Sequence, residues 1–140
     1  MLSLLVLLTF AGIATAGYLT WKHYGPRRGP LVCPFGQSCD LVLESHYGRI
    51  LGVRNEVIGL GYYLITLVLL IMAWQGTALP FHLFATTSAL ATAFYLSIPA
   101  FLASLTLTAV QVFILRNYCS YCLAANVVNA AIFLVLLFRQ

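Results

Sequence analysis

Residues 57–115 read VIGLGYYLITLVLLIMAWQGTALPFHLFATTSALATAFYLSIPAFLASLTLTAVQVFIL, and none of these 59 residues is a lysine, arginine, aspartate or glutamate. About 20 apolar residues in a helix cross a hydrocarbon core of ~30 Å, so this stretch is too long for a single crossing. A turn at Gly76 offers a break. The stretch therefore predicts two membrane-spanning helices, at about residues 57–74 and 80–115. The second is over-long, at about 50 Å by helix rise, and must tilt, kink near Pro99 or project beyond the bilayer.

Two further apolar segments flank this stretch, at about residues 2–22 and 118–138. With them the chain has four predicted spans in a single domain, residues 1–140, and we expect an all-α membrane protein built as a four-transmembrane-helix bundle. A cleaved signal peptide is the alternative for the first segment, since Ala14–Ala16 resembles a cleavage site. However, no lysine or arginine precedes Lys22, whereas a signal peptide begins with a positively charged region.

The composition of the whole chain agrees with a lipid environment. Hydrophobic residues make up 62% and charged residues 7%, whereas a soluble domain carries roughly 25% charged residues. The net charge of +4 comes from cations beside the apolar spans, where they set topology and meet lipid headgroups. We therefore expect membrane lipid as a partner and no nucleic acid.

A polar connection, residues 23–56, joins the first two predicted spans. It holds several glycines and prolines and seven of the chain's ten charged residues, so its early part is predicted to be a surface loop. Cys33 and Cys39 lie in this loop. From Leu41 to Arg49 the sequence follows helical spacing, which predicts a short amphipathic helix along the membrane surface.

The other two cysteines, Cys119 and Cys122, form a C-x-x-C at the start of the last span. Residues i and i+3 share a face of a helix, close enough for a disulfide, and a helix N-terminus stabilises the thiolate that attacks disulfides. Two spans separate this pair from Cys33 and Cys39, so all four cysteines are predicted to lie on one side of the membrane. Two dithiol pairs on one side can exchange through a mixed disulfide. A lipid-soluble quinone can reach the C-x-x-C at the membrane surface.

Metal binding and purely structural disulfides are the alternatives for these cysteines. A four-thiolate zinc site usually takes two close pairs, each spaced C-x2-4-C. Cys119 and Cys122 fit this spacing, whereas Cys33 and Cys39, spaced C-x5-C, do not. We therefore expect no metal, and keep a structural or metal-binding membrane protein as the alternative to a thiol oxidoreductase.

Three motifs resemble the vitamin K epoxide reductase family, particularly its microbial homologues. They are C-P-x4-C-D at Cys33–Asp40, S-x-Y-G-x-x-x-G-V at Ser45–Val53 and Y-C-x-Y-C at Tyr118–Cys122. The resemblance covers about residues 1–138. It implies a bundle of four helices around a quinone, and a membrane thiol oxidoreductase that generates disulfides with menaquinone, ubiquinone or a similar quinone as electron acceptor.

The resemblance also implies a role for each cysteine. Cys119 and Cys122 would be the active pair, with Cys122 facing the quinone. Cys33 would take electrons from a thioredoxin-like or disulfide-isomerase-like protein, and Cys39 would pass them to Cys119. Many bacterial members carry a fused thioredoxin domain, which this sequence lacks, so we expect a separate partner protein.

Three further residues are candidates for contact with the quinone: Ser45, Tyr118 and Asn126. Ser45 matches a serine that lies near the active site in the family, and Tyr118 belongs to the Y-C-x-Y-C motif. Asn126 stands where animal members of the family have a tyrosine. A polar side chain within a span should face the bundle interior, so Asn126 either donates to a quinone oxygen or forms a hydrogen bond between helices.

The distribution of positive charge predicts the orientation. Six of the seven lysines and arginines lie on the cysteine side of the predicted topology, and only Arg139 lies on the other. Positively charged residues in short loops favour the cytoplasm. We therefore expect a protein of the cell membrane whose cysteines face the cytoplasm and whose termini lie outside. Cytosolic disulfides are rare outside hyperthermophilic organisms, but the family that the motifs resemble includes microbial members of inverted topology.

Overall fold

The computed structural model describes residues 1–25, 39–50, 52–76 and 89–139. In chain order, its elements are α1 (Leu2–Tyr24), α2 (Cys39–Glu44), η1 (His46–Gly48), β1 (Arg49–Ile50), β2 (Val53–Arg54), α3 (Asn55–Gln75), α4 (Ala89–Ala109), η3 (Val110–Leu115) and α5 (Ser120–Leu137). Within these residues, four helices are long and apolar enough to cross a membrane: α1, α3, α4 continued by η3, and α5. This confirms the predicted all-α membrane protein. Cys33 and the beginning of the predicted span 80–115 lie outside the described residues.

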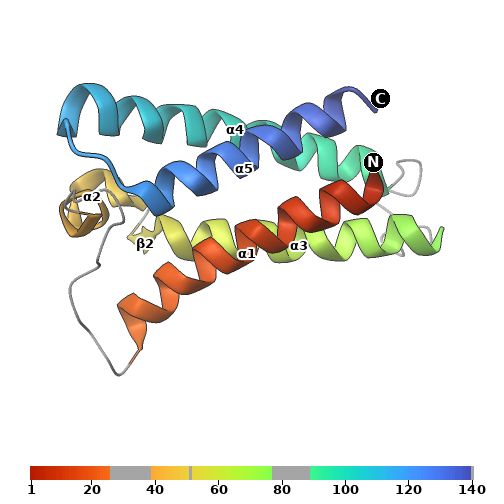
Figure 1. Cartoon of the computed structure of the whole chain (residues 1–140), viewed down its shortest axis with the longest axis horizontal. Helices are drawn as coiled ribbons and strands as arrows, with labels where there is room; N and C mark the ends of the chain where they lie inside the picture. Colours follow the sequence, from red (N-terminus) through yellow and green to blue (C-terminus); the bar gives the residue numbers. More distant parts are fainter. Residues whose placement is uncertain (26–38, 51, 77–88, 140) are drawn as a thin grey trace.

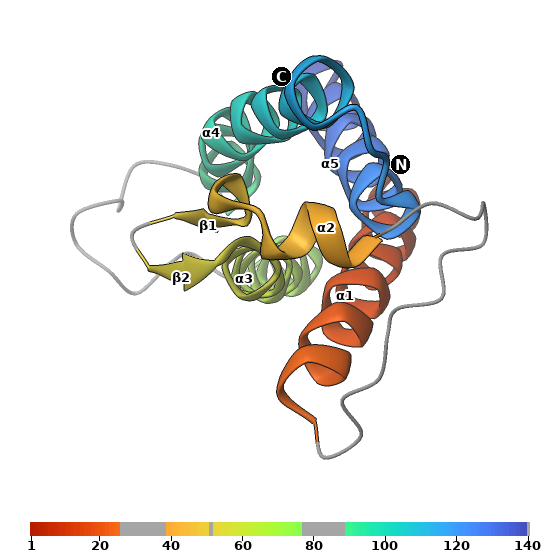
Figure 2. The same ribbon diagram turned by 90° about the vertical axis from the view of Figure 1, so that its left-hand side faces the viewer.

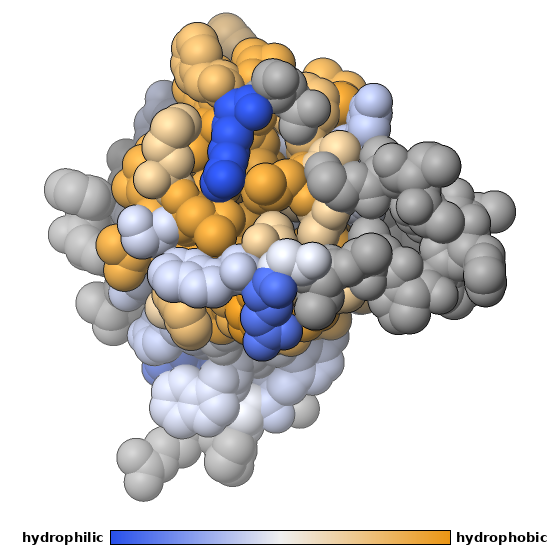
Figure 3. Space-filling view, turned by 90° about the vertical axis from the view of Figure 1, so that its right-hand side faces the viewer, coloured by the Kyte–Doolittle hydropathy of each residue, from blue (hydrophilic) through white to orange (hydrophobic). Residues whose placement is uncertain are grey.

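The four long helices form a bundle in which α1 and α4 each pack against both α3 and α5. Both chain termini lie at one end of this bundle, and α2 lies at the other (Figure 1). Seen from that second end, α2 lies across the mouth of the bundle beside the small hairpin of β1 and β2 (Figure 2). At the end that carries the termini, hydrophobic side chains occupy much of the described surface (Figure 3). Large apolar side chains are also exposed on the long helices, Leu7, Ile65 and Leu105 among them, as expected for helices solvated by lipid.

Helix α2 forms where the sequence predicts a short amphipathic helix. Its residues Val42 and Leu43 are buried against the bundle, whereas Leu41 and Glu44 face outward. The helix ends at Glu44, so the predicted continuation of helical spacing to Arg49 is wrong. The chain instead turns back on itself. The Ser45 hydroxyl donates to the carbonyl of Val42 at 2.7 Å, and Gly48 lies so close to Leu43 that an added Cβ would overlap the Leu43 carbonyl.

Helices α1 and α3 pack closely at Gly12. An added Cβ at this glycine would overlap the ring of Tyr63. The Tyr63 side chain is almost fully buried, and its hydroxyl donates to the backbone carbonyl of Ala125 on α5 at 2.9 Å. Small residues let helix backbones approach in membranes, so Gly12 and Tyr63 together connect three of the four spans.

The third span ends in an irregular segment. Pro99 lies inside α4, and the helix continues into the π-helical turns of η3. Arg116 then adopts a left-handed backbone conformation with φ of 49°, which non-glycine residues rarely adopt. This residue ends the span and directs the chain across the end of the bundle to Cys119.

Candidate functional site

Two cysteines from distant parts of the sequence meet at the α2 end of the bundle. Cys39 begins α2, and Cys119 immediately precedes α5. Both are 0% exposed, and both belong to a buried group that we call the thiol cluster; its members are Leu19, Cys39, Val42, Leu43 and Cys119. Cys122 packs against this cluster. The prediction that the two pairs share one side is therefore confirmed for Cys39, Cys119 and Cys122, while Cys33 lies outside the described residues.

The cysteines are in different redox states. Cys39 is disulfide-bonded, whereas Cys119 and Cys122 are free thiols. Because a sulfur in a disulfide is not a thiolate ligand, this state does not present four thiolates to a zinc ion. Among the described residues, no group of three or more histidine, cysteine or acidic side chains could hold a metal.

Cys119 occupies the N-cap position of α5, as the C-x-x-C at a helix start implies. Its sulfur accepts a hydrogen bond from the backbone N–H of Cys122 at 3.3 Å. The hydrogen bond from the Cys122 side chain is the main reason that the pKa of Cys119 lies below its usual value; burial of the sulfur and the nearby Glu56 carboxylate act in the opposite direction. The backbone N–H of Cys119 donates to Gln111 Oε1 at 3.1 Å. The thiolate of Cys119 is therefore stabilised in a buried position.

A cavity of about 140 Å³ lies inside the bundle next to this dithiol. Its lining comes from α1, α2, α3, α4, η3 and α5, with one example from each: Leu19, Val42, Tyr62, Leu107, Val110 and Cys122. Cys122 lines the cavity and Cys119 does not. The two sulfurs thus have different surroundings, one facing the cavity and the other packed in the thiol cluster.

Two asparagines of α5 line the cavity on the side of α4. The Asn126 amide donates to the Thr108 hydroxyl at 2.8 Å. The Asn129 amide donates to the Ala100 carbonyl at 2.9 Å and to the Ser104 hydroxyl at 2.7 Å. Since the Ala100 carbonyl can only accept, the amide nitrogen must face it. The Asn129 oxygen then remains buried without a hydrogen-bond partner among the described residues, so the cavity wall offers a ligand an unused acceptor.

The predicted quinone contacts divide into two groups. Ser45 and Asn126 line the cavity. Asn126 also makes the hydrogen bond between helices that was its alternative role. Tyr118 lies in the segment between η3 and α5, is 39% exposed and does not line the cavity.

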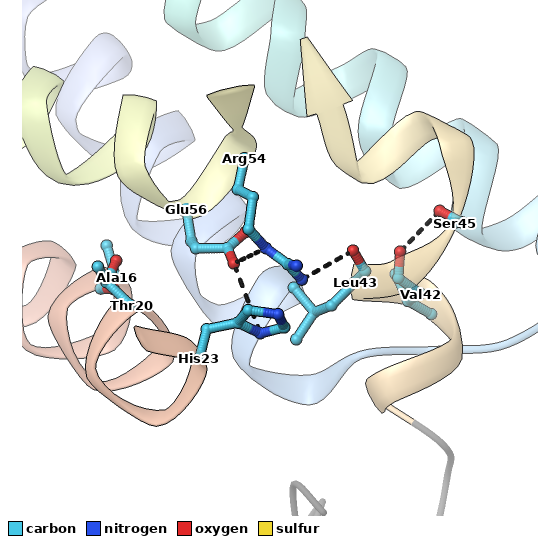
Figure 4. A network of polar contacts seen from close by, with 8 residues as sticks. All are labelled: Ala16, Thr20, His23, Val42, Leu43, Ser45, Arg54 and Glu56. Atoms are coloured by element: carbon cyan, nitrogen blue, oxygen red, sulfur yellow. Dashed lines mark hydrogen bonds and ion pairs between the residues drawn. The ribbon is translucent and has the colours of Figure 1, made fainter. Parts of the chain in front are cut away.

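Glu56, Arg54 and Gln111 are the residues near the dithiol that sequence reasoning did not single out. Glu56 lines the cavity and accepts a hydrogen bond from Arg54 Nε at 2.7 Å (Figure 4). Arg54 also donates to the Leu43 carbonyl at 3.2 Å, which ties the start of α3 to α2. The sequence position of Glu56 could have indicated it as a candidate, because Glu56 is the last charged residue before the 59-residue uncharged stretch.

The sequence profile of the vitamin K epoxide reductase family matches residues 3–137 of the 140-residue chain. A search of curated proteins found no match. The matched range contains the four cysteines and every residue that lines the cavity.

Proposed function

The chain belongs to the vitamin K epoxide reductase family, and we propose that it forms disulfides in other proteins by passing their electrons through its four cysteines to a quinone. Family membership and the four spanning helices make it an integral membrane oxidoreductase of the disulfide-generating type. We propose three further points: the order in which the cysteines react, a quinone as the electron acceptor, and a separate redox partner.

In the proposed relay, a separate thioredoxin-like or disulfide-isomerase-like protein reduces the Cys33–Cys39 disulfide by thiol–disulfide exchange and leaves with a disulfide of its own. Cys39 then attacks Cys119 in the Cys119–Cys122 disulfide, which breaks that bond and releases Cys122 as a thiolate. Attack of Cys33 on Cys39 restores the first disulfide and releases Cys119. One cycle moves two electrons from the partner to the active pair.

The observation that carries this proposal is the placement of the two free thiols. Cys119 is buried in the thiol cluster with Cys39, and Cys122 lines the cavity. A dithiol placed in this way can exchange with Cys39 on one side and reduce a bound molecule on the other. The lowered pKa of Cys119 favours the thiolate, which is the form that reacts.

The cavity has the chemical character that a quinone ring requires. Apolar side chains such as Leu107 and Val110 form much of its wall, and ligand sites of this kind add a few placed polar groups. Ser45, Asn126 and Asn129 supply such groups. A quinone accepts two electrons and two protons and becomes a hydroquinone. We propose menaquinone, ubiquinone or a similar lipid-soluble quinone, which reaches the bundle through the membrane.

Turnover with a quinone tests this function directly. Purified protein in detergent, mixed with a reduced thioredoxin-like protein and a short-chain ubiquinone, is expected to consume one quinone for each disulfide that forms. Quinone absorbance and free thiols are measured on the same sample, and omission of the quinone is the control. Loss of thiols without loss of quinone, or no loss of either, would contradict the proposed function.

We also propose that the cysteine end of the bundle faces the cytoplasm. The described cations at that end are Lys22, Arg49, Arg54 and Arg116, whereas only Arg139 follows α5. Arg54 is buried against Glu56. Without Arg54, three described cations at the cysteine end still outnumber the single Arg139, which favours this orientation by the positive-inside rule.

The orientation predicts where the C-terminus lies. A phosphatase that folds only outside the cytoplasm, fused after Gln140, is expected to be active, and a fluorescent protein that matures only in the cytoplasm is expected to be dark. The same reporters fused after Gly76, which follows α3 and lies at the same end as the termini, serve as a matched control. A fluorescent C-terminal fusion with inactive phosphatase would exclude the cytoplasmic orientation of the cysteines.

A further inference from the structure

Glu56 is a buried acid at the start of α3, and nothing in the cysteine relay uses it. Its side chain is 2% exposed. One carboxylate oxygen, Oε1, accepts the hydrogen bond from Arg54 Nε at 2.7 Å. The other, Oε2, is buried and has no hydrogen-bond partner among the described residues. Buried polar atoms are nearly always satisfied, so an unpaired carboxylate oxygen calls for a partner supplied from elsewhere.

The unpaired oxygen belongs to a residue that lines the same cavity as Cys122. The Glu56 carboxylate is also close enough to Cys119 to raise the pKa of that thiol. Glu56 is therefore close both to the active dithiol and to the space in which the quinone is proposed to bind. In the part of the chain that the structure describes, the other charged or titratable groups that face it are Arg54 from β2 and His23 from α1.

His23 connects this buried acid to the surface. Its Nδ1 lies 3.9 Å from Glu56 Oε1, and its side chain is 25% exposed. Figure 4 shows His23 on α1 directed at the Glu56 carboxylate. A carboxyl group that lines a cavity, with one oxygen unpaired and the other beside a partly exposed imidazole, has the arrangement of a proton relay.

We propose that Glu56 is the proton-transfer group of quinone reduction, an inference that rests on the proposed function. In this half-reaction the S–H bonds of Cys119 and Cys122 break and a disulfide bond forms between the two sulfurs. Their two electrons pass to the quinone, and two protons must reach its two oxygens. Glu56 Oε2 accepts the protons that leave the thiols, one at a time, and donates them to the quinone oxygens. The carboxyl group ends unchanged, and His23 lets it exchange protons with water.

A purely structural role is the competing explanation, since Glu56 also holds Arg54 against the Leu43 carbonyl. Glu56→Gln distinguishes the structural role from proton transfer. Glutamine keeps the size of the side chain and an oxygen that accepts from Arg54, but it cannot carry a proton. Glu44→Gln is the matched control, because Glu44 lies on α2 with its side chain exposed.

The test measures the two half-reactions separately. Protein reduced beforehand is mixed without oxygen with a short-chain ubiquinone, and its absorbance follows the quinone half-reaction. We expect Glu56→Gln to slow this step by about 10²–10⁴-fold, the range for loss of a general acid–base group. Transfer of electrons from a reduced thioredoxin-like protein to the oxidised cysteines, measured without quinone, should be unchanged. Glu44→Gln should match the original protein in both.

Chemical rescue provides a second measurement, because a small acid would not restore the rate if Glu56 had only a structural role. Formic acid added to Glu56→Ala should restore part of the quinone half-reaction, because the small acid fits the space of the missing carboxyl group. Rescue, or a selective loss in Glu56→Gln, supports the proposal. Equal rates for Glu56→Gln and the original protein, or equal slowing of both half-reactions, would overturn it. A lack of quinone reduction by the original protein would instead overturn the proposed function, and this proposal with it.

Discussion

Replacing Cys122 with alanine is expected to abolish quinone-dependent thiol oxidation. Cys122 is the sulfur that lines the cavity, so its loss removes the group that faces the quinone. Cys119 keeps its buried position beside Cys39 and can still exchange with it. Without Cys122, Cys119 has no partner with which to form the disulfide of the active pair, so the electrons cannot pass to the quinone.

The turnover assay measures this prediction. Ser120→Ala is the matched control, since it alters the same C-x-x-C without removing a sulfur, and it should retain turnover. Turnover in Cys122→Ala close to that of the control would remove the relay.

Arg54→Met is expected to cause a large loss of stability. Methionine leaves the carboxylate of Glu56 buried without its cation, and removal of one member of a buried ion pair typically costs about 3–5 kcal/mol. It also removes the hydrogen bond to the Leu43 carbonyl. Arg49→Met, on the exposed residue paired with Arg54 in the hairpin, should leave the unfolding free energy nearly unchanged.

A double substitution identifies the origin of this loss. Arg54→Met combined with Glu56→Gln removes both charges, so it should regain much of the stability lost in Arg54→Met alone. The free energy of unfolding in detergent is measured for the set of variants. If the double variant is as unstable as Arg54→Met, the loss comes from the contact between Arg54 and Leu43 rather than from the unpaired charge.

Hydropathy was sufficient to predict the four spanning helices, because the bilayer demands long apolar helices and excludes most other structures. The charge-free residues 57–115 could only be divided near Gly76, and α3 ends at Gln75. The parity of spans also placed Cys39 and Cys119 at one end of the bundle. These inferences depend on length and composition, which a sequence displays directly.

The partners of individual polar residues could not be predicted in this way. Arg54 and Glu56 resemble ordinary charges of a polar connection, and only the hairpin and the start of α3 bury them together. Gln111 reaches the backbone of Cys119 from η3, whose π-helical turns shift side chains away from regular helical spacing. Tertiary structure, rather than local sequence, determines both contacts.

Side chains from all four spans line the cavity. A molecule bound there would contact all four helices and so stabilise the whole bundle. A ligand that binds only the folded protein stabilises it by about 2.7 kcal/mol at a concentration 100 times its dissociation constant. Melting temperature therefore becomes a measure of occupancy that requires no redox chemistry. A panel of quinones that differ in ring substituents and tail length could be ranked by this shift, even in variants whose cysteines have been replaced.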